Sequence, residues 1–391
     1  MTMRLHDTAR RAVVPFEPGP VVSMYVCGIT PYDSTHLGHA FTYLTHDLLI
    51  RRLEDLGHEV RMVRNFTDID DPLYAKALDL GVDAMELAER EIARFQADTE
   101  ALGLRPPIAQ PRVSTSIPAI VSAVERLLDA GHAYTVDGTT YFDVTTFDRF
   151  GRFSGGDEDE LIALAAERGG TPDDPRQRHP LDFVLWKPSA PGEHEWPSPF
   201  GPGRPGWHIE CTAMATEHLG PTIDLHGGGS DLVFPHHECE IAQTEALTGQ
   251  PFVRHWFHVG MVAYQGEKMS KSLGNLVFVS ELRERHDPRA IRLALLPFHY
   301  RDGFEWFDEM IDAGGADLAL LEAAAARSEG PDPTGTAEKV RAHLDDDLDT
   351  ASARTALLDL AQRMADGEGS VRTAPKVLID LAALLGVALS H

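Results

Sequence analysis

The stretch between residues 21 and 66 restricts the fold more than any other part of the sequence. Residues 21–27 are an apolar run typical of a buried strand, and leucines recur at helical spacing between residues 41 and 56. Gly57 is expected to end that helix, and residues 60–66 are expected to form a second strand. A strand, a helix and a strand form a βαβ unit, whose parallel strands bind ligands at their carboxyl ends. A ligand is therefore expected just after the first strand.

The remainder of the chain divides by composition. Residues 101–200 are rich in Pro, Gly and Asp and have weak periodicity, which indicates an insertion between two halves of the sheet. Further strands and helices are expected between residues 206 and 260. After Phe307 the chain becomes helical and rich in alanine, with residues 330–335 expected as a linker or long turn. These patterns predict an α/β fold with a helical C-terminal part.

Cysteine content and charge limit the setting in which the chain works. Cys27, Cys211 and Cys239 are too few and too scattered for a disulfide framework, which predicts a cytoplasmic protein. Neither a secretion signal nor an apolar stretch long enough to span a bilayer is apparent, so no membrane partner is expected. Acidic side chains number 61 against 35 basic ones, and the net charge of −26 disfavours extensive contact with nucleic acid.

The string His36-Leu37-Gly38-His39 lies between the first expected strand and its helix. Free backbone N–H groups and the helix dipole favour phosphate at such a position. The imidazoles of His36 and His39 can hydrogen-bond a triphosphate and stabilise the charge that develops as pyrophosphate leaves. Surface or helix-capping histidines explain the string equally well when it is considered alone.

A second string, Lys268-Met269-Ser270-Lys271-Ser272, precedes Leu273-Gly274-Asn275. Two lysines with small hydroxyl residues on such a loop suit a mobile clamp for transferring phosphates, although a solvated basic loop is the alternative. The two strings stand about 230 residues apart and flank two halves of an α/β sheet. In this combination they resemble the signature of class I aminoacyl-tRNA synthetases.

A glycine-rich segment, residues 224–231, stands between these motifs. It is expected to be a strand that runs into a turn where glycines let a flat nucleoside approach the backbone. Asp231 at its end is a candidate acceptor for ribose hydroxyl groups. A purely structural turn explains the glycines equally well.

Three distant segments contain candidate metal ligands. Cys27 ends the first expected strand, Cys211 lies in the second half of the sheet, and His236 and Glu240 belong to the segment Pro-His-His-Glu-Cys-Glu. If that segment is helical, His236 and Glu240 are at i and i+4 and share one face. Two thiolates, one imidazole and a replaceable fourth ligand describe a zinc site with an open position. Inert buried cysteines are the alternative, favoured for Cys239, whose i+3 spacing from His236 nevertheless makes it a rival to Glu240.

These motifs together resemble cysteinyl-tRNA synthetases and, more closely, the cysteine ligases of mycothiol biosynthesis, which look like shortened relatives of them. Residues 27–40 resemble the ligase form of the first motif, and Pro72 stands where synthetases usually have Lys. Residues 167–172 are similar to a ligase signature and depart from it at Thr171, where that family usually has Asp. The similarity extends from about residue 4 to residue 306.

The resemblance implies a Rossmann-type class I synthetase core and a particular domain order. The expected parts are the first half of the core (1–100), a connective insertion (101–200), the second half with the zinc site and the lysine-rich loop (201–275), a stem-contact region (276–315) and a helical C-terminal domain (316–391). This last part holds seven Lys and Arg against thirteen Asp and Glu. An acidic tail is unsuited to reading an anticodon, so tRNA is not an expected partner.

The resemblance also implies site residues. A cysteinyl-adenylate would contact Cys27, Gly28, Ile29, Thr30, Thr42, Asn65, Phe66, Thr67, Trp207, Gly229, Ser230, Asp231 and Val262. Catalysis would use His36, His39, Lys268 and Lys271, the last on ATP phosphate. One Zn²⁺ per chain would bind Cys27, Cys211 and His236. Glu240 occupies the position of the fourth zinc ligand in synthetases, where the ligases generally lack a carboxylate, so the fourth ligand is open between Glu240 and water.

The reaction implied is ligation of L-cysteine to the amine of glucosaminyl-inositol, driven by Mg²⁺-ATP through a cysteinyl-adenylate, by a protein expected to be monomeric. Two alternatives stay open: a truncated cysteinyl-tRNA synthetase, and a catalytically silent synthetase-like binding protein. Intact phosphate and metal motifs argue against the silent protein. The sequence does not identify the residue that deprotonates the acceptor amine or those that hold the inositol.

Overall fold

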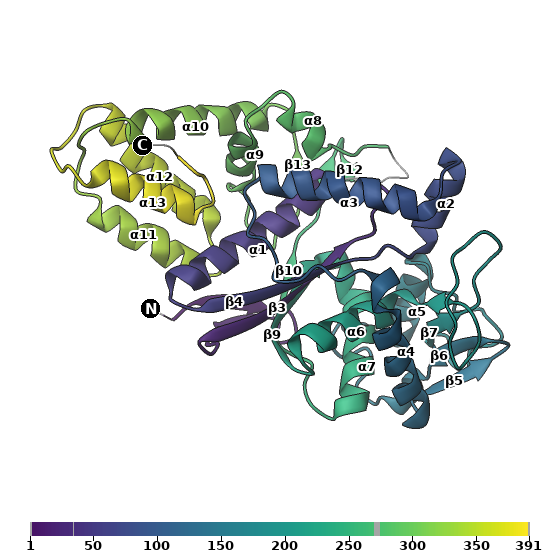
Figure 1. Cartoon of the computed structure of the whole chain (residues 1–391). Coiled ribbons are helices and arrows are strands. Elements are labelled where there is room, and N and C mark those ends of the chain that lie inside the picture. Colours follow the sequence, from purple (N-terminus) through teal and green to yellow (C-terminus); the bar gives the residue numbers. More distant parts are fainter. Residues whose placement is uncertain (1, 34, 270–273, 390–391) are drawn as a thin grey trace.

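A parallel sheet forms the centre of the computed structural model, which describes residues 2–33, 35–269 and 274–389 (Figure 1). The strand order is β10-β9-β3-β4, and every neighbouring pair is parallel. The strands are β3 (Val21–Ile29), β4 (Glu59–Phe66), β9 (Ile223–Gly229) and β10 (Val253–Val259). This arrangement confirms the predicted α/β fold with a Rossmann-type core.

Helix α1 (Leu37–Asp55) joins β3 to β4 and completes the predicted βαβ unit. The helix begins earlier than the leucine pattern predicts because His36 caps it: the imidazole Nδ1 accepts a hydrogen bond of 3.1 Å from the Gly38 N–H. Gly57 follows the helix with φ = 93°, a backbone conformation that glycine adopts at little cost. The predicted end of the helix is therefore correct.

Between β4 and β9 the chain leaves the parallel sheet and builds a second, antiparallel sheet of order β5-β6-β7-β8. The elements of this part are α2 (Asp71–Leu80), α3 (Ala84–Ala101), α4 (Val113–Asp129), β5 (Ala133–Val136), β6 (Thr139–Phe142), a 3₁₀ turn (Val144–Thr146), α5 (Glu158–Glu167), β7 (Phe183–Lys187) and β8 (Arg204–Pro205). The strands are short and the loops between them contain many Pro and Gly residues, which accounts for the weak periodicity of the sequence here.

The chain returns to the parallel sheet through α6 (Trp207–Leu219) and β9. A 3₁₀ turn (Ser230–Leu232) and a π-helical turn (Val233–His237) then lead into α7 (Glu238–Thr248) and β10. Helix α6 contacts both α4 and α7. This packing brings α6 and the turn before α7 to the same side of the sheet.

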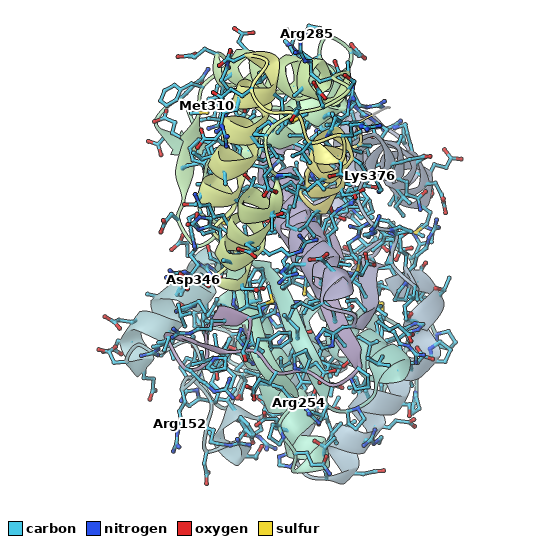
Figure 2. The ribbon with its side chains drawn as sticks, turned by 90° about the vertical axis from the view of Figure 1, so that its left-hand side faces the viewer. Arg152, Arg254, Arg285, Met310, Asp346 and Lys376 are labelled. Carbon is cyan, nitrogen blue, oxygen red and sulfur yellow. The ribbon has the colours of Figure 1, made fainter. Side chains whose placement is uncertain are left out.

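The C-terminal part of the described chain is helical. It contains α8 (Val279–Arg283), α9 (Pro288–Leu295), α10 (Met310–Ala325), α11 (Thr334–Asp345), α12 (Thr350–Ala365) and α13 (Ala374–Leu384). Helix α11 already begins at Thr334, so the connection expected at residues 330–335 is shorter than predicted. Figure 2 shows these helices, with Met310 and Lys376, at one end of the molecule and Arg152 and Arg254 at the other.

The smaller sheets complete the fold. They consist of the hairpin of β1 (Arg4–Asp7) and β2 (Ala12–Pro15), and the sheet β12-β11-β13 of β11 (Val262–Tyr264), β12 (Glu267–Lys268) and β13 (Phe304–Trp306). Across residues 2–33, 35–269 and 274–389, no helix combines the length and apolar character needed to cross a membrane. The domain boundaries expected from the sequence stay a prediction.

Candidate active site

The candidate site lies where the parallel strands end. Cys27 is close to the end of β3, Asn65 to the end of β4, and Gly229 closes β9. Cys211 comes from α6, and His236 comes from the turn before α7. This is the edge of an α/β sheet at which ligands bind.

A buried group of potential metal ligands occupies this edge. The donor atoms of Cys27, His236, His237 and Glu240 all lie within 4.8 Å of one another. Cys211 extends the group, because its Sγ lies 3.9 Å from the Sγ of Cys27. The structure thus brings together Cys27, His236 and Glu240 of the predicted ligands, and it places Cys211 beside Cys27.

His237 is the member of this group that the sequence analysis missed. Its Nε2 lies 3.4 Å from the Sγ of Cys27, and its Nδ1 lies 2.7 Å from Nε2 of His258. The spacing contained the signal, because His237 and Glu240 are at i and i+3 and also share a helical face. The sequence analysis named only His236, which is at i and i+4 with Glu240, as the histidine ligand.

Burial favours the neutral forms of Cys27, Glu240, His236 and His237. Burial raises the pKa of the Cys27 thiol and of the Glu240 carboxyl well above their usual ranges. Burial also holds the pKa of His236 and of His237 well below the ordinary imidazole value. A bound cation would reverse the preference of Cys27 and Glu240, because it favours thiolate and carboxylate, and it would keep both imidazoles neutral.

Glu240 provides an independent test of whether these residues fit a metal ion. Its carboxyl is fully buried, and within the described part of the chain neither oxygen makes a hydrogen bond, although Oε2 lies 3.0 Å from Nε2 of His226. A buried carboxyl without hydrogen bonds is costly. The unsatisfied oxygens, two thiols and two imidazoles form the donor set that zinc prefers.

The histidines of the first motif lie at the start of α1. His36 is the N-cap residue, and the ring centroids of His36 and His39 are 3.8 Å apart in a stacked arrangement. Both imidazoles therefore sit where the helix N-terminus favours anions.

The lysine-rich motif falls partly within the described chain. The backbone of Lys268 belongs to β12, and the N–H of Met269 donates to the carbonyl of Val262 at 3.1 Å. The Asn275 side chain donates to the carbonyl of Tyr264 at 3.0 Å. The base of the loop is thus attached to β11, while Lys271 lies outside the described residues.

Gly28 and Asn65 join β3 to β4 where an adenylate is expected. The N–H of Gly28 donates to Oδ1 of Asn65 at 2.8 Å, and the Asn65 side chain donates to Oγ1 of Thr67 at 3.1 Å. A Cβ at Gly28 would lie 1.6 Å from the carbonyl oxygen of Asn65, so only glycine fits.

Several of the expected adenylate contacts have buried side chains. Ile29, Phe66 and Val262 are each at most 2% exposed and belong to the hydrophobic core. The Thr42 hydroxyl donates to the carbonyl of Gly38 at 3.1 Å, within α1. The three buried residues can offer a ligand their backbone rather than their side chains.

The signature at residues 167–172 connects the second sheet to the nucleotide and metal segments. Arg168 follows α5, and its guanidinium donates to the backbone carbonyls of Asp231 and Phe234. Ser230 and Asp231 form the 3₁₀ turn after Gly229. Arg168 therefore braces the turn that precedes His236.

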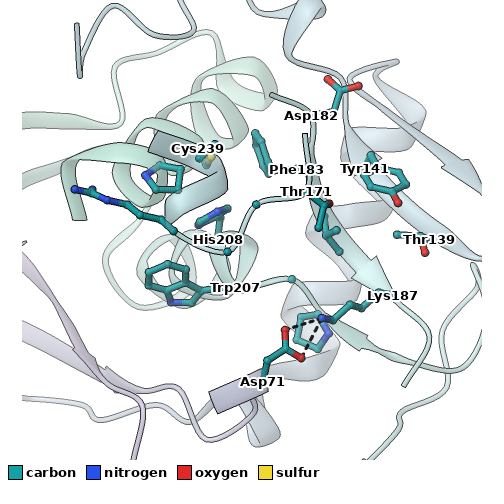
Figure 3. A pocket seen from close by; sticks show the side chains of 18 of the residues that line it. Asp71, Thr139, Tyr141, Thr171, Asp182, Phe183, Lys187, Trp207, His208 and Cys239 are labelled. Atoms are coloured by element: carbon teal, nitrogen blue, oxygen red, sulfur yellow. Dashed lines mark hydrogen bonds and ion pairs between the residues drawn. The ribbon is translucent and has the colours of Figure 1, made fainter. Parts of the chain in front are cut away.

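A cavity of about 810 Å³ opens beside the metal group, between α6 and the second sheet (Figure 3). Trp207 forms part of one wall, and its ring stacks on the His236 ring at a centroid distance of 4.4 Å. Thr139 and Tyr141 lie across the cavity on β6. Asp71 and Lys187 form an ion pair of 2.8 Å between the two sides.

Among the other carboxyl groups that line this cavity are Asp70 and Glu210, and the sequence analysis identified neither as a site residue. Loss of solvent, and then the neighbouring charge of Asp71, raises the pKa of Asp70 to about 6. Burial, and then the charge of Asp70, raises the pKa of Glu210 well above its usual range. Both carboxyl groups therefore belong to the wall of one cavity, and the charge of Asp70 acts on Glu210.

Comparison with known proteins gives the same fold. The family of tRNA synthetases class I (C) catalytic domains matches residues 13–315. The methionyl-tRNA synthetase of Mycobacterium tuberculosis, solved with methionyl-adenylate, superposes with a TM-score of 0.65 at 18% identity, covering 93% of this chain and 89% of that one.

Much more similar sequences define the family more narrowly. The L-cysteine:1D-myo-inositol 2-amino-2-deoxy-alpha-D-glucopyranoside ligase of Thermobispora bispora is 52% identical over 89% of this chain and 87% of its own length. The protein of the same name from Streptosporangium roseum is 50% identical over 88% of this chain and 85% of its own length. With the class I core and the Cys27–His236 site in place, the chain belongs to the family of L-cysteine:1D-myo-inositol 2-amino-2-deoxy-alpha-D-glucopyranoside ligases, within the class I tRNA-synthetase catalytic domains.

Proposed function

We propose that this protein joins L-cysteine to the amine of 1D-myo-inositol 2-amino-2-deoxy-α-D-glucopyranoside, using ATP and forming a carbon–nitrogen amide bond. The observation that carries the proposal is the buried cysteine–histidine–glutamate group beside the cavity wall formed by Trp207. Such a group suits selection of a thiol substrate. The names of the 52% and 50% identical relatives supply the second substrate.

The metal that this donor set fits best is zinc. Cys27, Cys211 and His236 would hold it, with Glu240 or water at the fourth position. When bound, zinc would supply a soft Lewis acid that bonds a thiolate better than a hydroxyl group, which would favour cysteine over serine. His237 would orient Cys27, because its Nε2 lies 3.4 Å from that sulfur and its other nitrogen contacts His258.

Activation would occur toward the start of α1. The cysteine carboxylate attacks the α-phosphorus of ATP, an oxygen–phosphorus bond forms, and pyrophosphate leaves with its electron pair. His36 and His39 stand at the helix N-terminus, where they can stabilise the developing charge together with Mg²⁺ and the lysines of the 268–272 loop. Gly28 and Asn65 would hold the adenylate, and Asp231 would bind its ribose hydroxyl groups.

A tRNA acceptor is the second candidate, because the fold is that of tRNA synthetases. The acidic segment 316–391 argues against it, since phosphate backbones bind basic surfaces. The small-molecule acceptor is therefore preferred. We also propose a cytoplasmic location, because Cys27, Cys211 and Cys239 are all free thiols.

The decisive experiment measures AMP release from ATP with cysteine, comparing glucosaminyl-inositol with tRNA as acceptor. We expect AMP release that depends on cysteine and rises with glucosaminyl-inositol, and no stimulation by tRNA at physiological salt. Efficient, salt-sensitive charging of tRNA would replace the ligase by a synthetase. Absence of AMP release with either acceptor would favour a silent binding protein.

A further inference from the structure

The cavity reaches well beyond the residues expected to hold cysteine and the nucleotide. One end is formed by Thr30 and Trp207, where the cysteinyl group is expected, and the other by Thr139 and Arg176 on the second sheet and its loops. Its volume of about 810 Å³ is within the range of small-molecule sites. Under the proposed function, on which this inference rests, a second substrate must approach the cysteinyl carbonyl from such a space.

Glu210 is the most unusual residue of the cavity wall. It lies in the first turn of α6 and is 1% exposed. Within the described part of the chain, its Oε2 has no hydrogen-bond partner. A buried carboxyl oxygen without a donor is costly, and such exceptions call for a missing partner. A ligand with N–H groups in the cavity would provide that partner.

Asp70 adds a second carboxyl group to the wall of the same cavity. It is the N-cap of α2, and its oxygens accept hydrogen bonds from the Asp71 N–H (2.8 Å) and from the Thr30 hydroxyl (3.2 Å). Thr30 is an expected adenylate contact, so Asp70 lies beside the place where the cysteinyl-adenylate is expected.

Asp71, the next residue in the chain, differs from Asp70 and Glu210 in its ion pairs. Its carboxylate forms ion pairs with Lys187 and Arg204, which neutralise it. In the described chain, Asp70 and Glu210 have no such ion pair. Two carboxyl groups that line one cavity and form no ion pair of their own among the described residues provide a site suited to an ammonium group.

We propose that Asp70 and Glu210 bind the protonated amine of the acceptor, that Asp70 takes its proton, and that the polar wall around Thr139 and Arg176 faces the hydroxyl groups of a polyhydroxylated carrier. The chemical class assigned to this end of the cavity is a primary amine on a small polyol.

The chemistry balances with two protons. The acceptor ammonium gives one proton to Asp70, and its nitrogen lone pair then attacks the cysteinyl carbonyl carbon. A carbon–nitrogen bond forms, the carbon–oxygen bond to AMP breaks, and AMP leaves with the electron pair. The second proton leaves the nitrogen for water as the amide forms. Glu210 keeps the amine in place through hydrogen bonding.

A pH dependence follows from the surroundings of Asp70. The groups that face it are the Asp71 carboxylate, the Thr30 hydroxyl, the Arg204 guanidinium on β8 and the Glu210 carboxyl on α6. Burial, and then the charge of Asp71, outweigh the Thr30 hydrogen bond and the Arg204 charge and raise the pKa of Asp70 to about 6. The transfer step should therefore fall as pH decreases through about 6, because the base becomes protonated.

The test uses single-turnover transfer from enzyme-bound cysteinyl-adenylate. Asp70→Asn should slow transfer to glucosaminyl-inositol by about 10²- to 10³-fold and remove the acidic limb near pH 6. Transfer to hydroxylamine, which is unprotonated at neutral pH, should fall at least tenfold less. Glu210→Gln keeps the side-chain shape and should raise the KM for glucosaminyl-inositol by about tenfold or more. Asp79→Asn, on the exposed side of α2, is the matched control and should match the unsubstituted enzyme in both assays.

Other outcomes decide against the assignment. Equal losses with both nucleophiles, or an unchanged acidic limb, would remove Asp70 from proton transfer. An unaltered KM in Glu210→Gln would remove Glu210 from the amine site even if Asp70→Asn does not fold. If the unsubstituted protein activates cysteine but ignores glucosaminyl-inositol, the proposed function fails, whereas normal ligation with unaffected variants overturns this inference alone.

Discussion

Two buried polar clusters in this protein differ in how completely their groups are paired. Arg292 of α9 is fully buried, yet its guanidinium pairs with Asp47 and donates to the carbonyls of Leu385 (2.7 Å) and Leu102 (3.2 Å). Glu240 is buried to the same degree, but within the described residues its oxygens make no hydrogen bond. The first cluster is complete without any ligand, and the second is not.

The electrostatic consequences follow the same division. Burial alone would raise the pKa of Asp47, but the guanidinium groups of Arg292 and Arg51 lower it below its usual value. For Glu240 no cation among the described residues opposes burial, and its pKa is raised well above the usual value. A satisfied buried charge therefore joins parts of the fold, here α1, α9 and the chain after α13. A buried carboxyl group without hydrogen-bond partners instead indicates a ligand-binding site.

The largest effect is expected from removing a cysteine of the metal group. Cys211→Ala should lose zinc and reduce cysteine-dependent pyrophosphate exchange by about 10³-fold, because the soft ligand set is broken. Metal analysis and the exchange rate are measured together. Cys239→Ala, an equally buried thiol on α7, is the control and should keep both. A zinc-free protein that still selects cysteine over serine would remove the metal from the mechanism.

The paired cluster should respond in stability rather than in chemistry. Arg292→Met leaves Asp47 buried with fewer partners and should lower the free energy of unfolding by about 3–5 kcal/mol. Urea unfolding at neutral pH measures this change. The double variant Asp47→Asn/Arg292→Met should lose less unfolding free energy than the sum of the two single losses, because it leaves neither charge buried alone. Additive losses would mean that the pair does not act as a unit.

Glu240 tests whether the fourth position of the metal group is replaceable. Glu240→Ala should retain zinc near the unsubstituted level and keep cysteine activation within about tenfold, because water can take the place of the carboxylate. Zinc content and serine discrimination are the measurements. A loss as large as that of Cys211→Ala would make Glu240 an essential ligand.

The smallest effect is expected at an exposed ion pair. Lys376 and Asp380 on α13 are 3.0 Å apart, with side chains 69% and 57% exposed. Lys376→Ala should change the free energy of unfolding by less than about 0.5 kcal/mol, because solvent screens the pair and the Lys-to-Asp order is the weaker one. The same urea experiment used for Arg292 provides the comparison. A loss comparable to that of Arg292→Met would contradict the role of burial in this ranking.

Part of the fold and of the candidate site could be predicted from the sequence, because local geometry determines it. The leucine spacing predicted the helix of the βαβ unit, and the apolar runs on either side of it predicted the two strands. The i, i+4 relation predicted that His236 and Glu240 share one face. The same kind of reasoning located His36 and His39 at a helix start, where the structure places them. The sequence placed the end of the first strand at Cys27, short of Ile29, since strand ends depend on pairing with β4.

The tertiary structure decided which distant residues meet. Asp70 and Glu210 are 140 positions apart in the sequence, and only the folded chain brings both into the wall of one cavity. Arg168 reaches the carbonyls of Asp231 and Phe234 only because α5 packs against the turn that contains Phe234. Periodicity and capping act within a few residues of chain, whereas burial, pairing and unsatisfied hydrogen bonds arise only when separate segments exclude water together.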